Sequence, residues 1–563
     1  MRMTGAQAII ESLRCEGVEV VFGYPGGSVL TLYDALYEAK FPHVLTRHEQ
    51  GAAHAADGYA RSTGKVGVCM ATSGPGATNL VTGIATAYMD SIPLVAITGQ
   101  VAVPLIGRDS FQEADVRGIT TPITKHNYLV KDVREIPHVM KEAFYIARTG
   151  RPGPVLIDVA KDIFAAELDF EYPKEVVLRG YHPIVEGDTE LIRSVAQDLA
   201  QAKKPLIFVG GGANLSDISP ALRELIDYTQ IPVITSLMGL GSIPGDHPLN
   251  LGMVGMHGTY TANMATIDCD VLLGIGVRFD DRVTGLVEHF APNAKLIHCD
   301  IDPAEINKNI IVDTRVVGDL RWTVPSLLDE VKKWPAGEWA GKNPEWRIQL
   351  KESQEKMPLS FTQRPNQVMP QEVIQCISKL TAGDAIVVTD VGQHQMWTAQ
   401  FFNFQHPRHF LTSGGLGTMG YGVPAGMGAQ VGLPDKKVVV IAGDGGFMMN
   451  CQELSTIADL NLPVKIIIIN NQVLGMVSQW QRMFYNKHYA HSRLEGHADF
   501  VKLADAMGIQ GMRVNRPEEL EEALEKALAV EGPIVVDIRI PEDEDVIPMV
   551  PAGARLDQMI MGG

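Results

Sequence analysis

The chain of 563 residues is too long for one hydrophobic core, so we expect three domains of ordinary size. Its formal net charge of −18, with no run of basic residues, argues against nucleic acid or an anionic membrane as a partner. No apolar segment approaches the roughly 18 residues of a membrane-spanning helix, and signal-peptide flanks are absent. The six cysteines lack metal-binding spacing, which favours reduced thiols. These features predict a cytoplasmic protein.

In chain order, alternating helix and strand patterns predict an α/β fold with three doubly wound parallel-sheet domains. The expected parts are residues 1–170, 189–340 and 368–541, followed by a tail at 542–563. Polar segments containing Pro and Gly, at 172–188 and from 334 to about 370, predict the two linkers between them.

In the first domain, Glu49 follows the strand that contains Val44 and Leu45 and precedes a helix rich in small residues. This position predicts a carboxylate at the mouth of a parallel sheet. An alternative is that Glu49 only stabilises the positive end of a helix dipole.

In the middle domain, a strand at 206–209 runs into Gly210-Gly211-Gly212, and a later strand at 296–299 ends in Asp300. Glycines after a strand let backbone approach a ligand, and an acid at a later strand end can bind ribose hydroxyls. The order resembles a dinucleotide fold. The strict GxGxxG pattern is absent, so a filled structural crevice is the alternative.

In the third domain, a buried strand at 437–442 leads into Gly443-Asp444-Gly445-Gly446, a predicted helix at 447–460, a strand at 464–469 and then Asn470-Asn471. A βαβ crossover makes the two strands parallel neighbours, so Asp444 and Asn471 emerge at the same sheet edge. Their oxygens suit Mg²⁺, which usually shares ligands with phosphates. An ordinary glycine-rich turn is the alternative for the GDG segment alone.

The paired GDG and Asn-Asn segments resemble the signature of thiamine diphosphate enzymes. Several further segments together resemble the acetohydroxyacid synthase (acetolactate synthase) catalytic subunits over nearly the whole chain. They are Tyr24-Pro25-Gly26-Gly27, Arg47-His48-Glu49-Gln50-Gly51, the segments at 107–113 and 475–480, and Arg278-Phe279-Asp280-Asp281-Arg282-Val283-Thr284-Gly285. The last segment is absent from the similar catabolic enzymes that lack FAD.

The resemblance implies three cofactors, thiamine diphosphate, Mg²⁺ and FAD, and a domain for each part of the site. The first domain would bind the thiamine pyrimidine, the middle domain FAD, and the third domain the diphosphate and metal. The implied metal ligands are Asp444, Asn471 and the backbone carbonyl of Val473. The implied thiamine contacts are Glu49, Gln393, His394, Gly417, Met419, Gly443, Gly445, Gly446, Gly475 and Met476. The implied FAD contacts are Arg151, Gly211, Gly212, Met256, His257, Gly258, Arg278, Asp300 and Asp319. Met419 as plain core packing is an alternative to its role under the cofactor.

The resemblance also implies the reaction, in which pyruvate is decarboxylated and its two-carbon unit joins a second 2-keto acid. Pyruvate would give 2-acetolactate, and 2-ketobutyrate would give 2-aceto-2-hydroxybutyrate, for valine, leucine and isoleucine synthesis. The implied catalytic residues are Glu49, Gln112 and Lys161, with Gly26, Gly27, Phe111, Arg282 and Trp480 around the substrate. For Trp480 a core aromatic is the alternative.

The resemblance further implies a homodimer or homotetramer with sites at the subunit interface, and a small regulatory subunit as partner. Two rival functions remain open from the sequence. One is a flavin oxidoreductase similar to pyruvate oxidase, which would depend on oxygen. The other is a thiamine- or nucleotide-binding regulator without catalysis, which would leave Glu49 and Asp444 without a chemical task.

Overall fold

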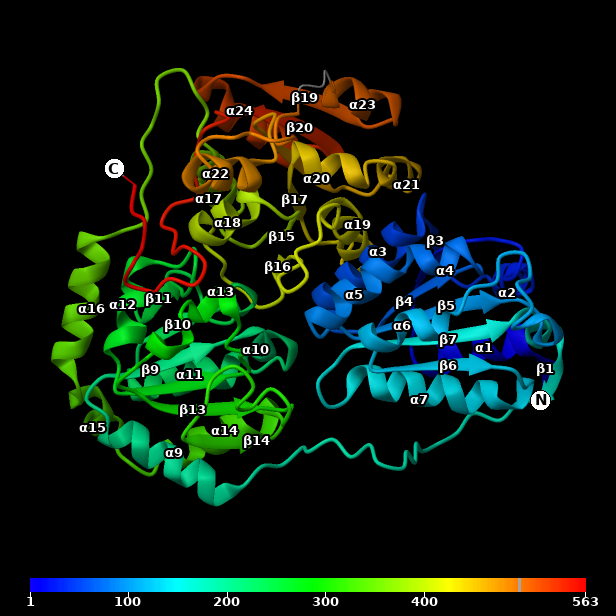
Figure 1. Ribbon diagram of the computed structural model, residues 1–563, viewed down its shortest axis with the longest axis horizontal. Helices are drawn as coiled ribbons and strands as arrows, with labels where there is room; N and C mark the ends of the chain where they lie inside the picture. Colours follow the sequence, from blue (N-terminus) through cyan, green and yellow to red (C-terminus); the bar gives the residue numbers. More distant parts are fainter. Residues whose placement is uncertain (495–497, 563) are drawn as a thin grey trace.

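The computed structural model describes residues 1–494 and 498–562, and it contains three α/β domains around separate sheets (Figure 1). In Figure 1 the first domain is blue to cyan, the second green, and the third yellow to red. This architecture confirms the predicted fold class. No helix in the described residues combines the length and the apolar character that crossing a membrane requires.

The first domain contains a six-stranded parallel sheet in the order β3-β2-β4-β5-β7-β6. A short antiparallel pair, β1 with β8, joins the two ends of this domain. The strands are β1 (Arg2–Thr4), β2 (Val21–Tyr24), β3 (His43–Leu45), β4 (Gly67–Ala71), β5 (Leu94–Gln100), β6 (His126–Val130), β7 (Pro154–Ala160) and β8 (Glu167–Asp169). The α-helices are α1 (Gly5–Cys15), α2 (Leu30–Ala39), α3 (Glu49–Thr63), α4 (Pro75–Asn79), α5 (Val81–Met89), α6 (Val116–Thr120), α7 (Ile136–Arg148) and α8 (Lys161–Ala165).

The second domain has the sheet order β11-β10-β9-β12-β13-β14, again parallel throughout. Its strands are β9 (Pro205–Val209), β10 (Val233–Thr235), β11 (Asn250–Met253), β12 (Val271–Ile275), β13 (Lys295–Asp300) and β14 (Thr314–Val317). Its α-helices are α9 (Thr189–Gln201), α10 (Gly211–Leu215), α11 (Ser219–Thr229), α12 (Tyr260–Asp268), α13 (Asp281–Thr284), α14 (Leu320–Val331), α15 (Ala336–Gly341) and α16 (Pro344–Lys356).

The third domain has the sheet order β16-β15-β17-β18-β20-β19, also parallel. Its strands are β15 (Ile386–Thr389), β16 (Phe410–Leu411), β17 (Val438–Gly443), β18 (Lys465–Asn470), β19 (Gln510–Val514) and β20 (Ile534–Arg539). Its α-helices are α17 (Pro370–Leu380), α18 (Gln393–Phe401), α19 (Gly422–Gly432), α20 (Asp444–Met449), α21 (Glu453–Asp459), α22 (Gly475–Phe484), α23 (Phe500–Ala506) and α24 (Pro517–Ala529).

Strand order separates the three domains into two kinds. Numbered within each six-stranded sheet, the first and third sheets both run 2-1-3-4-6-5, whereas the second runs 3-2-1-4-5-6. The second order is that of dinucleotide-binding folds. In all three sheets the order reverses beside the first strand of the sheet, and the carboxyl ends of strands at such a switch point form a crevice for ligands. The shared order fits the duplication that the similar glycine-rich segments at 72–76 and 412–417 suggest.

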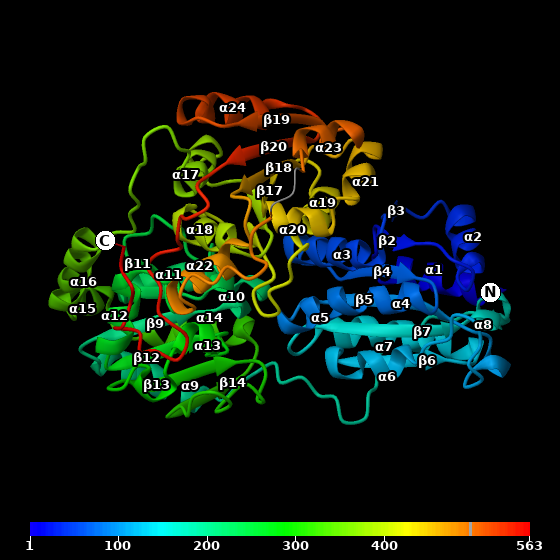
Figure 2. The same ribbon diagram turned by 45° about the horizontal axis from the view of Figure 1, so that its top comes forward.

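The first and third domains are joined by the packing of α3 on α19 (Figure 2). A Cβ atom at Gly58 would lie 2.1 Å from the carbonyl oxygen of Ala425, and one at Gly428 would lie 1.8 Å from that of Ala55. Only glycine therefore allows the two helix backbones to approach this closely. The contact continues the buried hydrophobic core from one domain into the other, so their relative orientation is fixed within one chain.

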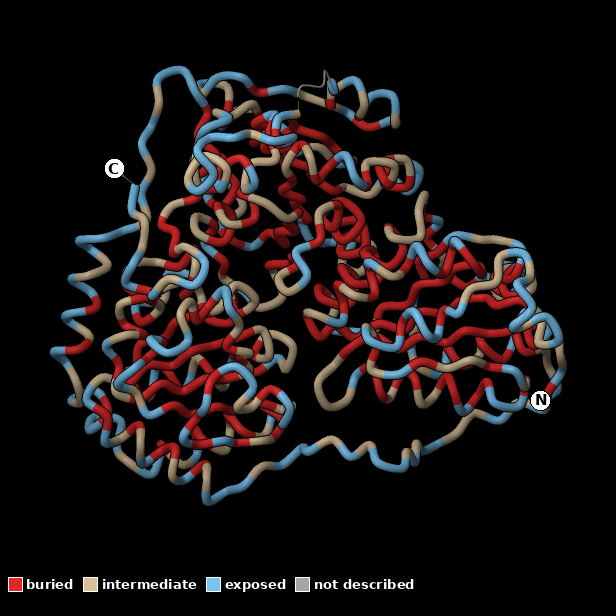
Figure 3. The backbone as a smooth tube through the Cα atoms, in the orientation of Figure 1, coloured by how far each residue is buried: buried red, intermediate tan, exposed pale blue. Residues whose placement is uncertain are grey.

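The segment at 172–188 has neither helix nor strand and runs largely exposed along the outside of the molecule (Figure 3). The predicted linker at 334–370 is wrong in part, because it contains α15 and α16. These helices bury Trp339, Trp346 and Leu350 against the second domain, and that apolar stripe stabilises them.

The single helix expected at 447–460 is divided into α20 and α21. Asn450 lies at the break, and its side-chain amide donates to the carbonyl oxygen of Gly420 over 2.7 Å. The helix is interrupted where this hydrogen bond ties it to the neighbouring turn. The tail beyond Arg539 returns to the second domain, where Val550 and Leu556 are buried (Figure 1).

Candidate functional site

A cavity of about 1010 Å³ lies where the three domains meet. Its walls come mainly from the carboxyl edges of the second and third sheets, with the ends of α5 and α7 from the first domain. Most of the predicted site residues line it: Arg151, Gly211, Gly212, Met256, His257, Arg278, Arg282, Asp300, Asp319, Gln393, His394, Gly417, Met419, Gly443, Asp444, Gly445, Gly446, Asn471, Val473, Gly475, Met476 and Trp480. The predicted FAD contact Gly258 lies beside this set but does not line the cavity.

The predicted metal ligands lie at the ends of β17 and β18, as the βαβ unit requires. Asp444 is 5% exposed, and its carboxylate accepts hydrogen bonds from the backbone N–H groups of Gly445 and Gln472. Burial raises the pKa of Asp444 to about 6, although these hydrogen bonds oppose the shift. A buried carboxylate of this kind would gain from a cation beside it.

The oxygen donors in the cavity fit Mg²⁺ that shares its ligands with a phosphate group. They are too few for a metal ion bound by protein side chains alone. In the described residues, no three His, Cys, Asp or Glu side chains gather closely enough to hold an ion. Asp444, the amide of Asn471 and the carbonyl of Val473 supply oxygens to the cavity, and the remaining ligands would come from phosphate and water.

His394 provides a second observation that fits a diphosphate. It is 6% exposed, and its Nε2 atom has no hydrogen-bond partner. Burial lowers the pKa of His394 to about 3, so the ring is neutral at physiological pH. A buried and unpartnered polar atom beside a cavity fits a bound polar ligand.

Gln393 differs from His394 in that its amide is already bonded. It donates to the side chain of Gln479 over 2.8 Å and to the carbonyl of Glu544 over 2.9 Å, and it accepts from Asn471 over 3.2 Å. In this arrangement Gln393 orients the predicted metal ligand Asn471. Its predicted direct contact with the diphosphate stays a prediction.

The turn that contains Gly417 and Met419 is held by a residue that the sequence-based reading missed. Asp390 is fully buried at the end of β15, and its carboxylate accepts from the backbone N–H groups of Gly420, Gly422 and Val391. Asp390 thereby fixes the backbone around Met419. Its position directly after a strand was the available signal, although nothing in the sequence shows that it bonds to a turn 30 residues later.

The second-domain end of the cavity lies at the switch point between β9 and β12. A Cβ atom at Gly210 would lie 2.1 Å from the carbonyl oxygen of Gly276, so close strand packing already requires that glycine. Gly211, Gly212, Arg278 and Asp300 line the cavity beyond it. Polar groups at the carboxyl edge of a dinucleotide-type sheet fit a nucleotide cofactor.

The predicted first-domain residues form a different cluster. Glu49, Gly26, Gly27, Phe111, Gln112 and Lys161 all follow strands of the first sheet at its carboxyl edge, and none of them lines the cavity. Glu49 accepts from the side-chain amide of Asn79 over 3.0 Å. A Cβ atom at Gly76 would lie 3.2 Å from Glu49 Oε1. The sheet therefore brings these residues to one edge, but away from Asp444 of the same chain.

A third-domain glutamate holds the turn that carries Glu49. Glu453 is fully buried at the start of α21, and its carboxylate accepts from the backbone N–H groups of Arg47 and His48 over 3.0 Å. The helix bearing Glu453 follows α20, which begins at Asp444. One chain thus links its own predicted metal-binding unit to its own Glu49 turn, although only the predicted metal ligands line the cavity.

Comparisons with known proteins agree with this geometry. The chain matches the thiamine pyrophosphate enzyme family in its N-terminal TPP binding domain at residues 3–119, its central domain at 192–327 and its C-terminal TPP binding domain at 390–538. Thiamine pyrophosphate is the same compound as thiamine diphosphate.

The chain is also similar along its whole length to curated relatives. It is 50% identical over 560 residues to an acetolactate synthase large subunit of Corynebacterium glutamicum, covering 98% of this chain and 89% of the relative. It is 49% identical over 571 residues to a probable acetolactate synthase large subunit of Methanocaldococcus jannaschii, covering 99% and 95%. It is 49% identical over 562 residues to an acetolactate synthase of Arthrospira platensis, covering 98% and 96%. With near-complete coverage and three matched domains, the chain belongs to the family of thiamine pyrophosphate-dependent acetolactate synthase large subunits.

Proposed function

We propose that this catalytic subunit joins the two-carbon unit of pyruvate to either of two acceptors, pyruvate or 2-ketobutyrate. The products are 2-acetolactate and 2-aceto-2-hydroxybutyrate, which lead to the branched-chain amino acids. The observation that supports this most strongly is one cavity that contains both Asp444 with Asn471 and the dinucleotide-type edge of the second sheet.

Bound thiamine diphosphate would supply a carbon nucleophile and an electron sink for the decarboxylation. The chain's own residues bind and orient the reactants. Asp444, Asn471 and the carbonyl of Val473 would hold Mg²⁺, and the neutral His394 would donate to the diphosphate. Met419 would pack against the cofactor, and Asp390 fixes the turn that carries Met419. Glu49 would hold a proton at N1′ of the aminopyrimidine.

Because Glu49 does not reach the cavity of its own chain, we propose that it completes the cavity of a second copy. Gln112, Lys161 and Phe111 would enter with it, since they lie on the same sheet edge. Exposed apolar side chains on both edges support this contact, with Phe111 89% exposed in the first domain and Tyr485 64% exposed in the third. A homodimer, or a homotetramer built from such dimers, contains complete sites.

The second acceptor is proposed to bind between Arg282 and Trp480. The guanidinium of Arg282 is exposed to the cavity, and it can hold a carboxylate in a bidentate fork. Trp480 is 37% exposed on α22 and lines the same cavity, so the alternative of a core aromatic is not favoured. Its indole offers an apolar wall to the ethyl group of 2-ketobutyrate.

FAD is proposed to bind at the second-domain end, with Arg151, Gly211, Gly212, Met256, His257, Gly258, Arg278, Asp300 and Asp319 around it. The condensation has no net redox change, so FAD has a structural task there. The name shared by several relatives, large subunit, supports a small regulatory subunit as a partner. We further propose a cytoplasmic location, which the free cysteines of the described chain fit.

The test is product analysis after incubation with pyruvate, 2-ketobutyrate, thiamine diphosphate, Mg²⁺ and FAD, with and without oxygen. Acetohydroxyacids that form equally without oxygen, with 2-aceto-2-hydroxybutyrate favoured, support the proposal. Oxygen-dependent acetate or peroxide without a condensed product would assign an oxidase instead. Absence of turnover even with the small subunit added would assign a binding role.

A further inference from the structure

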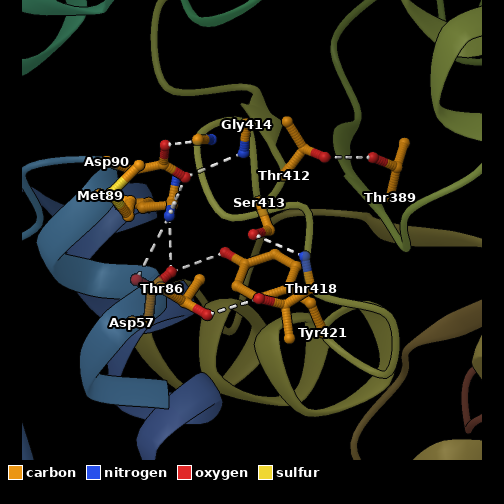
Figure 4. Close-up of polar contacts among 12 residues, drawn as sticks. Asp57, Thr86, Met89, Asp90, Thr389, Thr412, Ser413, Gly414, Thr418 and Tyr421 are labelled. Carbon is orange, nitrogen blue, oxygen red and sulfur yellow. Dashed lines mark hydrogen bonds and ion pairs between the residues drawn. The ribbon is translucent and has the colours of Figure 1, made fainter. Parts of the chain in front are cut away.

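The end of α5 is the place where all three domains touch beside the cavity. Met89, Asp90 and Ser91 belong to the first domain and line the cavity wall. Figure 4 shows Asp90 facing the turn that begins at Ser413 of the third domain. This turn lines the cavity from Ser413 to Gly417 and again at Met419, so its position shapes the thiamine end.

Asp90 binds the turn directly. Its carboxylate accepts from the backbone N–H groups of Gly414 over 2.9 Å and Gly415 over 2.7 Å. It also accepts from the guanidinium of Arg61 over 2.9 Å. Asp90 is 8% exposed and Arg61 5%, so these charge-assisted hydrogen bonds are shielded from water.

Two further hydrogen bonds join the same turn to the first domain. Asp57, which pairs with Arg61 over 2.5 Å, accepts from the hydroxyl of Tyr421 over 2.7 Å. The hydroxyls of Thr86 and Thr418 are 2.8 Å apart (Figure 4). Together these contacts bind both ends of the 413–421 segment to α3 and α5.

The other side of the junction faces the second domain. Arg278, a predicted FAD contact, donates to the carbonyl oxygen of Met89 over 2.9 Å. Arg151, another predicted FAD contact, donates to Ser91 over 2.7 Å and to Asp302 of the second domain over 3.2 Å. Ser91 has a φ of 62°, in the left-handed region that a serine rarely adopts. The junction is thus bound from both sides, so restraint of either arginine restrains the junction as well.

We propose that Asp90 is a positioning residue that couples the two ends of the cavity. The arginines that contact FAD hold Met89 and Ser91, Asp90 lies between these two residues, and Asp90 holds the turn at the thiamine end. Occupancy of the flavin end therefore orders the thiamine end. This inference rests on the cofactor assignment of the proposed function. It gives FAD a defined task in a reaction that transfers no net electrons.

The test measures binding in the full chain in its native assembly, at fixed Mg²⁺. The dissociation constant of thiamine diphosphate is determined by fluorescence titration with and without FAD, and that of FAD with and without thiamine diphosphate. In the wild-type chain we expect FAD to tighten thiamine diphosphate binding at least about fivefold, with the same factor in the reverse direction, because linkage is reciprocal. In Asp90→Asn the factor should approach one.

The matched control is Asp270→Asn. Asp270 also accepts from two successive backbone N–H groups, those of Lys203 and Lys204, over 2.7 and 2.8 Å, but it lies within the second domain and away from the cavity. This control should keep the wild-type factor. If Asp90→Asn fails to fold, the double variant Thr86→Val with Thr418→Val replaces it, because it loosens the same turn without leaving a buried charge unpaired. Its coupling factor should fall at least about twofold.

The outcomes separate the inference from the function on which it rests. A wild-type chain that binds both cofactors without any coupling would overturn the inference and leave the synthase intact. The same conclusion follows if the variants at Asp90 or at Thr86 and Thr418 keep the wild-type factor. A wild-type chain that does not bind FAD would remove the flavin assignment and the inference with it, and the product assay without FAD would show whether the synthase remains.

Discussion

The first and third domains share a strand order, yet the carboxyl edges of their sheets lie in different surroundings. The third edge is enclosed, and its polar groups Asp444, Asn471 and His394 are buried around a cavity. The first edge opens outward, and it carries Glu49 and a Phe111 side chain that is 89% exposed. The same strand order therefore presents two different groups of predicted site residues. The third sheet places a polar group around a cavity, and the first sheet places a second group at an exposed edge.

The α3 and α19 contact explains why the two halves do not meet within one chain. Gly58 and Gly428 let these helices pack closely, and Glu453 fixes the Glu49 turn to α21. Both contacts hold the first domain in an orientation that leaves Glu49 outside its own cavity. This difference between the two edges supports the proposal that each site is completed by a second copy of the chain.

The largest effect is expected from Glu49→Gln. The amide cannot share a proton with N1′, and positioned proton transfer of this kind contributes about 10²–10⁴ in rate. We expect acetolactate formation to fall at least about 100-fold while circular dichroism and the unfolding midpoint stay the same. Glu167→Gln, on the exposed strand β8 of the same domain, serves as control. Turnover of Glu49→Gln close to that of the control would reject the role of Glu49.

Asp444→Asn tests the other half of the site. Replacing the carboxylate by an amide removes the one negatively charged side chain among the predicted ligands, so we expect the Mg²⁺ concentration for half activity to rise about 10- to 100-fold. Asp435→Asn changes an exposed residue just before the opposite end of β17 and should leave the Mg²⁺ requirement unchanged. An unaltered requirement in Asp444→Asn would place the metal elsewhere.

Glu453→Gln tests how the buried carboxyl of Glu453 makes the stability of the fold depend on pH. Burial raises the pKa of Glu453 from 4.5 to about 7, against the opposing hydrogen bonds from Arg47 and His48. Because the folded pKa is raised, this carboxyl stabilises the fold fully below pH 4.5, and the contribution is lost as pH rises through about 7. The shift corresponds to about 3 kcal/mol.

The wild-type chain should therefore lose more unfolding free energy between pH 5 and pH 8 than Glu453→Gln does. Denaturant unfolding of both proteins at these two pH values measures the difference. Parallel losses in the two proteins would mean that Glu453 does not titrate in this window.

A smaller effect is expected from Trp480→Leu. Loss of the indole removes apolar contact with the ethyl group of 2-ketobutyrate, and contacts of this size change specificity by about 10-fold or somewhat more. The ratio of 2-aceto-2-hydroxybutyrate to 2-acetolactate, measured with both substrates present, should fall. Phe484→Leu, one turn further along α22 and outside the cavity lining, is the matched control. A product ratio equal to that of the control would contradict the role of Trp480.

How far the sequence predicts the structure depends on the range of the contacts that decide each feature. The position of the predicted metal ligands can be predicted because Asp444 and Asn471 follow adjacent strands of one βαβ unit, so local topology brings them together. The three parallel sheets follow for the same reason. Asp390 escaped prediction because its carboxylate binds backbone N–H groups of a distant turn, and any short acid after a strand looks alike in sequence.

The direction in which Glu49 faces depends on long-range packing. Gly58 and Gly428 look like ordinary glycines within helices until α3 meets α19, and Glu453 looks like a helix-terminus acid until it binds Arg47 and His48. The helices α15 and α16 were hidden by their polar composition, although Trp339 and Trp346 supplied an apolar signal. Features of this kind cannot be predicted from the sequence until the tertiary contact that causes them is known.

The central claim, that each complete site takes Glu49 from one copy and Asp444 from another, is tested most directly by mixing two inactive chains. Glu49→Gln and Asp444→Asn chains are coexpressed with different affinity tags, and the mixed assemblies are assayed for acetolactate. If halves are exchanged, one of the two sites in each mixed dimer has both residues intact, so the isolated mixed dimers should regain about half of wild-type activity. If each chain forms its own site, the mixture would stay as inactive as the separate variants, and the account would be contradicted.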